Sequence, residues 1–248
     1  MFEFGFKSDT GKMRNNNQDS FFVLPDKGVF LVADGVGGHS HGEVASRTVM
    51  ADIADYMNDS PIPPEADSDG IRDYFVSLLY HVNEHIYRMA DGGSTRSMAT
   101  TLILLYIHKG KAYVANVGDS RLYLIRDDSI RQVTEDHTYV NDLMKKGIID
   151  RTQAREHPDR NLITRAIGAE ENVRPDLYMF DVYEEDVLLL CTDGLYDMLE
   201  DEEIRKIVMK SNTMRSACIN LIDRANERGG ADNITAVTVR IQTGGQAQ

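Results

Sequence analysis

The stretch TLILLYIHKGKAYVANVGDSRLYLIRDDSIRQV, residues 101–133, decides the fold class. Its apolar or alternating runs lie at residues 101–107, 112–117, 121–125 and 130–133, and short turns join them. Runs of this length that are rich in β-branched and aromatic residues are typical of strands. Parallel neighbours would need crossover connections of a dozen or more residues. The stretch therefore predicts an antiparallel meander.

The flanks of this stretch predict further strands and pairs of helices. Apolar or alternating segments predict strands at residues 2–6, 20–24, 29–33, 187–191 and 234–241. Helical spacing of apolar residues predicts helices at residues 45–57, 71–89, 202–210 and 214–227. Strand clusters and helix pairs do not alternate one for one. An antiparallel α+β architecture is therefore favoured over a doubly wound parallel sheet.

Three polar segments predict surface structure. Residues 61–70 are rich in Pro and Asp and predict a loop. Residues 136–175 are polar with short helical pieces at 139–146 and 151–157, so a partly mobile flap, about residues 138–172, is expected on the sheet. We expect one domain over residues 1–241 and a frayed tail at 242–248.

Charge and cysteine content exclude several classes of protein. The 248 residues carry 27 Lys and Arg against 40 Asp and Glu, a formal net charge of -13, which argues against nucleic acid or an anionic membrane as main partner. Cys191 and Cys218 lie in apolar patterns and predict no disulfide framework. No run is long enough to span a membrane, and the N-terminus lacks a signal-peptide layout. We expect a cytoplasmic monomer without membrane or nucleic-acid partners.

Aspartates at the ends of apolar runs carry the functional signal. They are Asp34 in VADGVGGH, Asp119 in VANVGDSR, Asp193 in LLLCTDGL and Asp232 in GGADNIT. An unpaired carboxylate at a buried strand end costs desolvation energy unless a cation lies beside it. Mg²⁺ and Mn²⁺ prefer carboxylate, carbonyl and water oxygens. Each Asp-Gly pair alone is more often a simple turn, but together the four ends predict a carboxylate-lined metal centre.

The residues beside these aspartates suggest a hydrolytic mechanism. Gly35 allows a sharp turn after the strand, which brings the Gly35 carbonyl close to a bound ion. Beside it, the Asp34 carboxylate can bridge two ions. Metal coordination lowers the pKa of water to roughly 7, and two ions about 3.5–4 Å apart can share the resulting hydroxide as a nucleophile. The charges of such a cluster nearly cancel, so a phosphate would need a further cation. Arg14, in the polar loop MRNNNQDS, is the candidate, because guanidinium matches phosphate in bidentate fashion.

Taken in order, these motifs resemble those of the PPM family of metal-dependent serine/threonine protein phosphatases, the type 2C phosphatases, in its compact bacterial form. The motifs are an Arg followed by NQDS, then ADG-x-GGH, a Thr-Thr strand start, VGDSR, TDGL and GG-x-DN, spread over nearly the whole chain. The resemblance implies a four-layer α/β/β/α sandwich of two antiparallel sheets flanked by helix pairs. It also implies hydrolysis of phosphoserine and phosphothreonine in proteins, opposing a bacterial serine/threonine kinase that is itself an expected partner.

The resemblance further implies a role for each motif residue. Asp34 would bridge two Mg²⁺ or Mn²⁺ ions, the carbonyl of Gly35 would bind one of them, and Asp193 and Asp232 would hold the other. Asp119, with Asp193, would form a third, more weakly occupied site.

Arg14 would bind the substrate phosphate. Asp19 and Asn233 would orient ligands and waters without binding metal. His39 is a candidate for contact with substrate or a metal-bound water, whereas His41 suits a polar turn into a helix. Val36 departs from the family pattern, because eukaryotic members often have a His there that is proposed as general acid.

Four other functions compete with this interpretation of the sequence. Cys218 and Arg224 have the C-x₅-R spacing of cysteine-dependent phosphatases, but no Gly lies between them and Cys218 falls on an apolar helical stripe. Haloacid-dehalogenase phosphatases need a second carboxylate where Val36 stands. A non-catalytic phosphoprotein-binding scaffold would be expected to lack a ligand, and none is missing. A hydrolase of small phosphoesters or nucleotides is disfavoured by the lack of a P-loop.

Overall fold

The computed structural model describes residues 1–37, 41–91 and 98–242 of the chain. Its strands are β1 (Phe2–Asp9), β2 (Asp19–Leu24), β3 (Val29–Val36), β4 (Ala99–Thr100), β5 (Leu102–His108), β6 (Lys111–Val117), β7 (Arg121–Arg126), β8 (Ser129–Gln132), β9 (Asp176–Asp181), β10 (Val187–Cys191) and β11 (Ile234–Ile241). Its helices are α1 (His41–Asp59), α2 (Ser68–Asp91), α3 (Tyr139–Lys145), α4 (Arg151–Glu156), α5 (Asp193–Tyr196), α6 (Asp201–Lys210) and α7 (Met214–Glu227), with a 3₁₀ turn, η1, at Pro25–Lys27.

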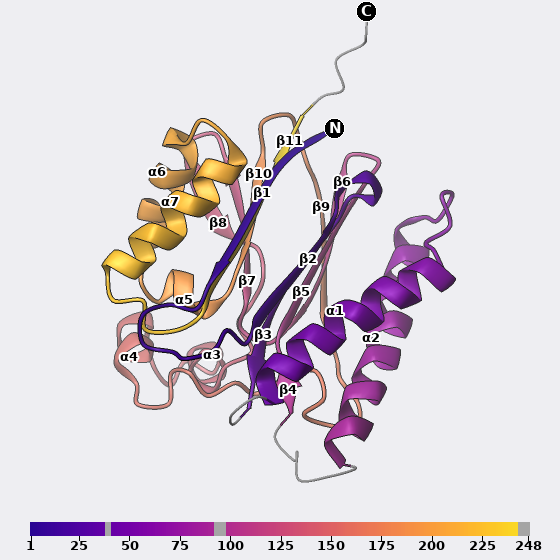
Figure 1. The fold of residues 1–248 in the computed structure, drawn as a ribbon, viewed down its shortest axis with the longest axis horizontal. Helices are drawn as coiled ribbons and strands as arrows, with labels where there is room; N and C mark the ends of the chain where they lie inside the picture. The colour runs from indigo at the N-terminus through magenta and orange to yellow at the C-terminus, as the bar shows by residue number, and fades with distance from the viewer. Residues whose placement is uncertain (38–40, 92–97, 243–248) are drawn as a thin grey trace, which may run out of the picture.

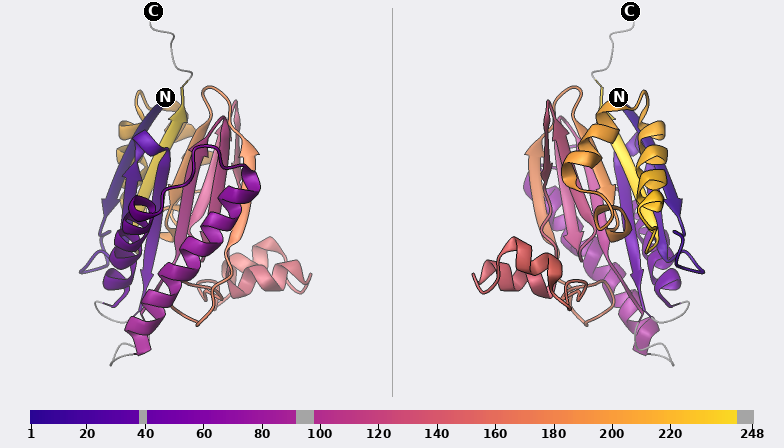
Figure 2. Two further views of the ribbon diagram at one scale, coloured as in Figure 1. Left: turned by 90° about the vertical axis from the view of Figure 1, so that its right-hand side faces the viewer. Right: turned by 90° about the vertical axis from the view of Figure 1, so that its left-hand side faces the viewer.

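Two antiparallel sheets face each other between layers of helices (Figure 1). One sheet has the order β1-β11-β10-β7-β8, and the other has the order β2-β3-β5-β6-β9 with β4 paired to β3. Helices α1 and α2 cover the outer face of the second sheet, and α5, α6 and α7 cover that of the first (Figures 1 and 2). The predicted four-layer α/β/β/α sandwich is confirmed.

Strand β5 shows why the central strands are apolar throughout. Leu102 and Leu104 pack in the cluster beneath α1 and α2, whereas Ile103 and Leu105 pack between the two sheets. Successive side chains of a strand point to opposite faces, so a strand covered on both faces needs an unbroken apolar run. A third apolar cluster, which includes Tyr123 of β7, lies beneath α5–α7. Three apolar layers therefore separate the four layers of backbone.

The predicted meander over residues 101–133 is wrong in one respect. Strands β5 and β6 pair in one sheet, but β7 and β8 belong to the other. The chain changes sheet at Gly118, whose φ of 101° lies in the left-handed region, where glycine is favoured. A Cβ at this position would also collide with Thr101. The turn that holds Asp119 is therefore the crossing between the two sheets.

Other boundaries differ from those predicted. Helix α2 begins at Ser68, inside the predicted loop 61–70, and β9 and α5 were not predicted. Residues 138–172 carry α3 and α4 and project from one end of the sandwich (Figure 2). Gln242 exchanges backbone hydrogen bonds with Met1, while residues 243–248 of the expected frayed tail lie outside the described residues. No helix in the described ranges is long and apolar enough to cross a membrane.

Candidate active site

The end of β3, the start of α5 and the start of β11 lie at one end of the sandwich, away from the start of β1 and the end of β11 (Figure 1). Asp34 lies near the end of β3, Asp193 begins α5 directly after β10, and Asp232 precedes β11. Asp119 lies at the crossing between β6 and β7. In an antiparallel sheet each strand ends on the side where its neighbour begins. Segments far apart in the sequence can therefore bring their carboxylates together on that side.

Asp34 faces another carboxylate across the sheet. The register of β2 and β3 places Asp19 directly opposite Asp34. Like charges in such cross-strand pairs are destabilising. Burial raises the pKa of Asp34 well above its usual range, and the charges of Asp19 and Asp193 raise it further. Burial also raises the pKa of Asp19 to about 7, although Thr192 donates a hydrogen bond to its Oδ2 over 2.8 Å. The pair therefore favours a nearby cation.

Carboxylate oxygens in this cluster lack partners. Among the described residues, Oδ1 of Asp19 and Oδ1 of Asp193 are buried without a hydrogen bond. Burial, followed by the charge of Asp119, raises the pKa of Asp193. Unpaired buried carboxylates are costly unless a cation compensates them. The donors are all oxygens, which suits Mg²⁺ or Mn²⁺ better than a thiophilic metal.

No three Asp, Glu, His or Cys side chains within residues 1–37, 41–91 and 98–242 form a ready-made cage around a single ion. Mg²⁺ usually keeps several waters and takes one or two carboxylates from the protein. The open arrangement fits ions completed by water and by backbone carbonyls such as that of Gly35.

Two glycines allow the site segments to approach one another. A Cβ on Gly35 would collide with the carbonyl of Gly42 at the start of α1. A Cβ on Gly194 would collide with the carbonyl of Asn233. The glycines that follow Asp34 and Asp193 are thus required by close packing. The start of α5 at Asp193 and Gly194 is consequently held against the segment that carries Asp232.

Two threonines clamp the backbone of Asp34. Thr101 Oγ1 accepts a hydrogen bond from the Asp34 N–H over 2.9 Å, and Thr100 Oγ1 donates to the Asp34 carbonyl over 2.8 Å. Thr101 Oγ1 also lies 2.7 Å from Ser120 Oγ, beside Asp119. The Thr-Thr pair therefore links the end of β3 to the sheet crossing.

Arg14 lies in the loop between β1 and β2, and its Nη2 is 2.6 Å from Asp232 Oδ2. The Arg14 side chain remains 51% exposed, so other guanidinium N–H groups can reach a ligand. Asn233 holds this loop, because its Nδ2 donates to the carbonyls of Thr10 and Asn16 over 2.8 and 2.9 Å. Its Oδ1 accepts from the Gln18 N–H over 2.8 Å. In this structure Asn233 thus anchors the backbone of the loop that carries Arg14.

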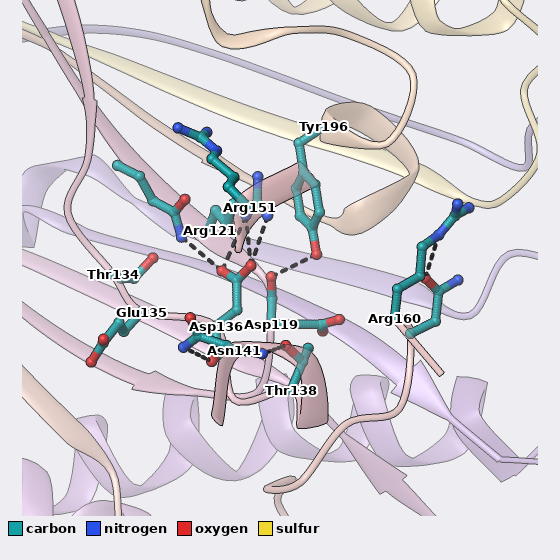
Figure 3. A network of polar contacts seen from close by, with 12 residues as sticks. Asp119, Arg121, Thr134, Glu135, Asp136, Thr138, Asn141, Arg151, Arg160 and Tyr196 are labelled. Atoms are coloured by element: carbon teal, nitrogen blue, oxygen red, sulfur yellow. Dashed lines mark hydrogen bonds and ion pairs between the residues drawn. The ribbon is translucent and has the colours of Figure 1, made fainter. Parts of the chain in front are cut away.

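A partly buried ion pair beside Asp119 was not predicted (Figure 3). Arg121 binds Asp136 with Nη2–Oδ2 at 2.7 Å and Nε–Oδ1 at 3.0 Å. The guanidinium also lies 3.5 Å from the ring centroid of Tyr196, whose hydroxyl donates to the Asp119 carbonyl over 2.9 Å. Because Arg121 binds Asp136, the simple ion pair between Asp119 and Arg121 is not formed. No local sequence pattern marks these long-range partners.

A groove of about 280 Å³ runs from Asp119 and Asp193 beneath α3 and α4. Ion pairs join its two walls, with Arg155 Nη2 at 2.9 Å from Glu200 Oε2 and Arg160 Nη2 at 4.0 Å from Asp197 Oδ2. The segment predicted as a flap therefore borders the carboxylate cluster directly.

The cysteine alternative is excluded by burial. Cys218 is fully buried in α7, and burial raises the pKa of its thiol to about 11. A nucleophilic cysteine needs a depressed pKa and access to substrate. Arg224 binds Glu203 over 2.8 Å instead of facing Cys218. His39 lies outside the described residues, and His41 is the first residue of α1.

Comparison with known proteins identifies the family. A family model described as "Protein phosphatase 2C" matches residues 12–236. The chain is 34% identical over 238 residues to the serine/threonine phosphatase stp of Listeria innocua, with 94% of each chain covered.

Solved structures agree. A serine/threonine phosphatase of S. agalactiae superposes with a TM-score of 0.91 at 32% identity, covering 98% of this chain and 100% of that one. The catalytic domain of the phosphatase PstP, solved with two manganese ions, superposes with a TM-score of 0.85 at 31% identity, covering 98% and 99%. The chain therefore belongs to the protein phosphatase 2C family and is a protein-serine/threonine phosphatase.

Proposed function

We propose that the chain hydrolyses phosphoserine and phosphothreonine in proteins with two Mg²⁺ or Mn²⁺ ions. Asp34 would bridge the ions, with the carbonyl of Gly35 on one and Asp193 and Asp232 on the other. The observation that carries the proposal is the meeting of these carboxylates at one end of the sandwich, where Asp19 lies opposite Asp34 and buried oxygens lack partners. When bound, the two ions would lower the pKa of a shared water, so that hydroxide is available as the nucleophile at neutral pH.

The protein groups would share the remaining work. Arg14 would bind and orient the phosphate, since its guanidinium is exposed beside Asp232. Thr100 and Thr101 would hold Asp34 in place. Val36 offers no proton to the leaving oxygen, so the general acid is not the side chain at this position.

Removal of metal tests the proposal. Activity on a phosphothreonine peptide should fall to background in EDTA and return with added Mn²⁺, because no protein nucleophile is proposed. ATP and p-nitrophenyl phosphate, assayed in parallel, should be poorer substrates than the peptide. Cys218→Ser should retain near-normal turnover as the matched control. Turnover by fully demetallated protein, or a large loss in Cys218→Ser, would overturn the mechanism.

Arg14→Ala should raise KM about tenfold, with a smaller fall in kcat, if Arg14 binds phosphate in both ground and transition states. Lys12→Ala, which removes a nearby exposed charge, is the control. The alternative is that Arg14 only neutralises Asp232. In that case KM would stay constant and Mn²⁺ would bind more tightly, because Asp232 would be released from its ion pair. Steady-state kinetics and calorimetry together decide between the two.

The stabilisation by metal should depend on pH. Burial raises the pKa of Asp19 and Asp119 from 3.8 to about 7, so without metal the folded state keeps protons that the unfolded chain loses. The stabilisation of the metal-free folded state by these protons is fully present below about pH 4 and is lost as the pH rises toward 7. Metal must displace these protons, so it binds better at higher pH. The difference in Tm between Mn²⁺-loaded and EDTA-treated protein should therefore grow from pH 5 to pH 8. A constant difference would contradict this.

We propose four further features of this enzyme. The low cysteine content fits a cytoplasmic enzyme, here proposed as a monomeric single domain that opposes a serine/threonine kinase.

Residues 138–172 would act as a flap that influences substrate choice, because α3 and α4 border the groove that leads to Asp119. His39 would contact substrate. A third, weaker cation site at Asp119 and Asp193 would complete the centre.

A further inference from the structure

His137, at the start of the flap, binds the turn that carries Asp119. The His137 N–H donates to the Gly118 carbonyl over 3.0 Å, and the Gly118 N–H donates to His137 Nδ1 over 3.0 Å. The His137 side chain is only 5% exposed. Gly118 itself has no room to shift toward Thr101, which a Cβ would already strike. The backbone just before Asp119 is therefore held by two hydrogen bonds to one residue.

The other edge of the same ring holds the returning end of the flap. His137 Nε2 lies 3.1 Å from Asp176 Oδ2, at the start of β9. Because Nδ1 accepts from Gly118, a neutral ring carries its proton on Nε2 and donates it to Asp176. Arg165 Nη1 binds Asp176 Oδ1 over 2.8 Å, and the Thr164 N–H donates to the His137 carbonyl over 2.8 Å. The two ends of the flap thus meet at His137.

Tyr196 holds Asp119 from the opposite side. Its hydroxyl donates to the Asp119 carbonyl, and its ring packs beneath Arg121, which binds Asp136 (Figure 3). Asn141 Nδ2 donates to the Asp136 carbonyl over 2.7 Å, so the first helix of the flap joins the same network. The contacts of the flap base and those of the Asp119 backbone therefore form one connected unit.

We propose that His137 and Tyr196 are positioning residues that hold Asp119 from two sides and join its cation site to the base of the flap. The proposal rests on the proposed role of Asp119 as a ligand of the weakest cation. Neither residue touches substrate or metal in this account. Groups that orient a metal ligand commonly change metal affinity by about 10–100-fold when they are lost.

Two substitutions separate the functions of the His137 ring. His137→Asn keeps an acceptor near the position of Nδ1 but loses the donor to Asp176. His137→Gln reaches the position of Nε2 but loses the acceptor for Gly118. Calorimetric titration with Mn²⁺ should show the weakest site about tenfold weaker in His137→Gln, with the tighter ions retained. In His137→Asn that site should stay within about twofold of wild type, while trypsin cleaves the flap faster.

Tyr196→Phe provides a second variant if His137→Gln does not fold. It removes only the hydroxyl, and the weakest Mn²⁺ site should again lose about tenfold in affinity. Tyr123→Phe is the matched control, because its hydroxyl accepts from Arg121 over 2.9 Å and has no contact with Asp119. Its weakest site should be unchanged.

The same titrations separate this proposal from the one on which it rests. If Asp119→Ala still binds the weakest ion, both the role of Asp119 as a ligand and the positioning role of His137 and Tyr196 are overturned. Loss of that ion in Asp119→Ala, with wild-type affinity in His137→Gln and Tyr196→Phe, would overturn only the positioning role. Equal weakening in His137→Asn and His137→Gln would show that the acceptor at Nδ1 is not what matters, and would also overturn it.

Discussion

Asp34→Asn should lower kcat roughly a thousandfold or more, which corresponds to about 4 kcal/mol of transition-state stabilisation. Asp34 is the one carboxylate proposed to serve both ions, and Asn has nearly its shape but no charge. The cluster would then be too positive to hold two dications and their shared hydroxide. Calorimetry should show that at least one tight Mn²⁺ site is lost, in parallel with turnover of a phosphothreonine peptide.

The same substitution should stabilise the metal-free protein. Asp34 is crowded by Asp19 and Asp193, and burial already disfavours its charged form. Where the Asp34 carboxyl is ionised, Asn removes its charge and relieves this repulsion, so Tm in EDTA should rise at alkaline pH while activity is lost. Asp128→Asn, which removes a fully exposed charge paired to Arg205, is the control and should change neither. Two tight metals with near-normal turnover in Asp34→Asn would refute the bridging role.

Much of the fold was predictable because the central strands are covered on both faces. β10, Val187–Cys191, is fully buried, and its apolar run predicted its bounds without error. β9 was missed because Asp176–Asp181 is an edge strand with mostly half-buried side chains. The crossing at Gly118 was missed because a short turn looks the same whether the chain stays in its sheet or leaves it. Topology depends on contacts that no local pattern contains.

The functional site was also predictable only in part. Its carboxylates were predictable because each lies at the end of an apolar run, where a charge is unexpected. The network around them was not, because its partners lie far apart in the chain. Arg121 and Asp136 are 15 residues apart, and Tyr196 and Asp119 are 77 apart. Asp136 begins the polar segment 136–175, which was predicted only to form a flap. Its contacts with the site depend on the packing of the two sheets, which the sequence does not show.

Asp119→Ala should reduce turnover of a phosphoprotein about 10–100-fold while the fold and the two tight ions are kept. The structure weakens the purely structural explanation of this residue, because Arg121 is already bound by Asp136. The contacts that hold the turn, from Tyr196 and His137, go to backbone atoms that alanine retains. Burial raises the pKa of the Asp119 carboxyl to about 7, so removing it should not lower Tm in EDTA.

The decisive comparison for Asp119→Ala is between stability and metal binding. A structural residue would lower Tm in EDTA and leave turnover per folded molecule unchanged. A ligand of the weakest cation would leave Tm in EDTA equal or higher and remove one Mn²⁺ from the titration. Asp197→Ala is a useful second variant, because Asp197 borders the same groove but pairs only distantly with Arg160. Its weakest site should change less than that of Asp119→Ala, since Asp193 and Asp119 are the proposed ligands. Normal turnover of Asp119→Ala with every ion retained would remove Asp119 from the catalytic centre.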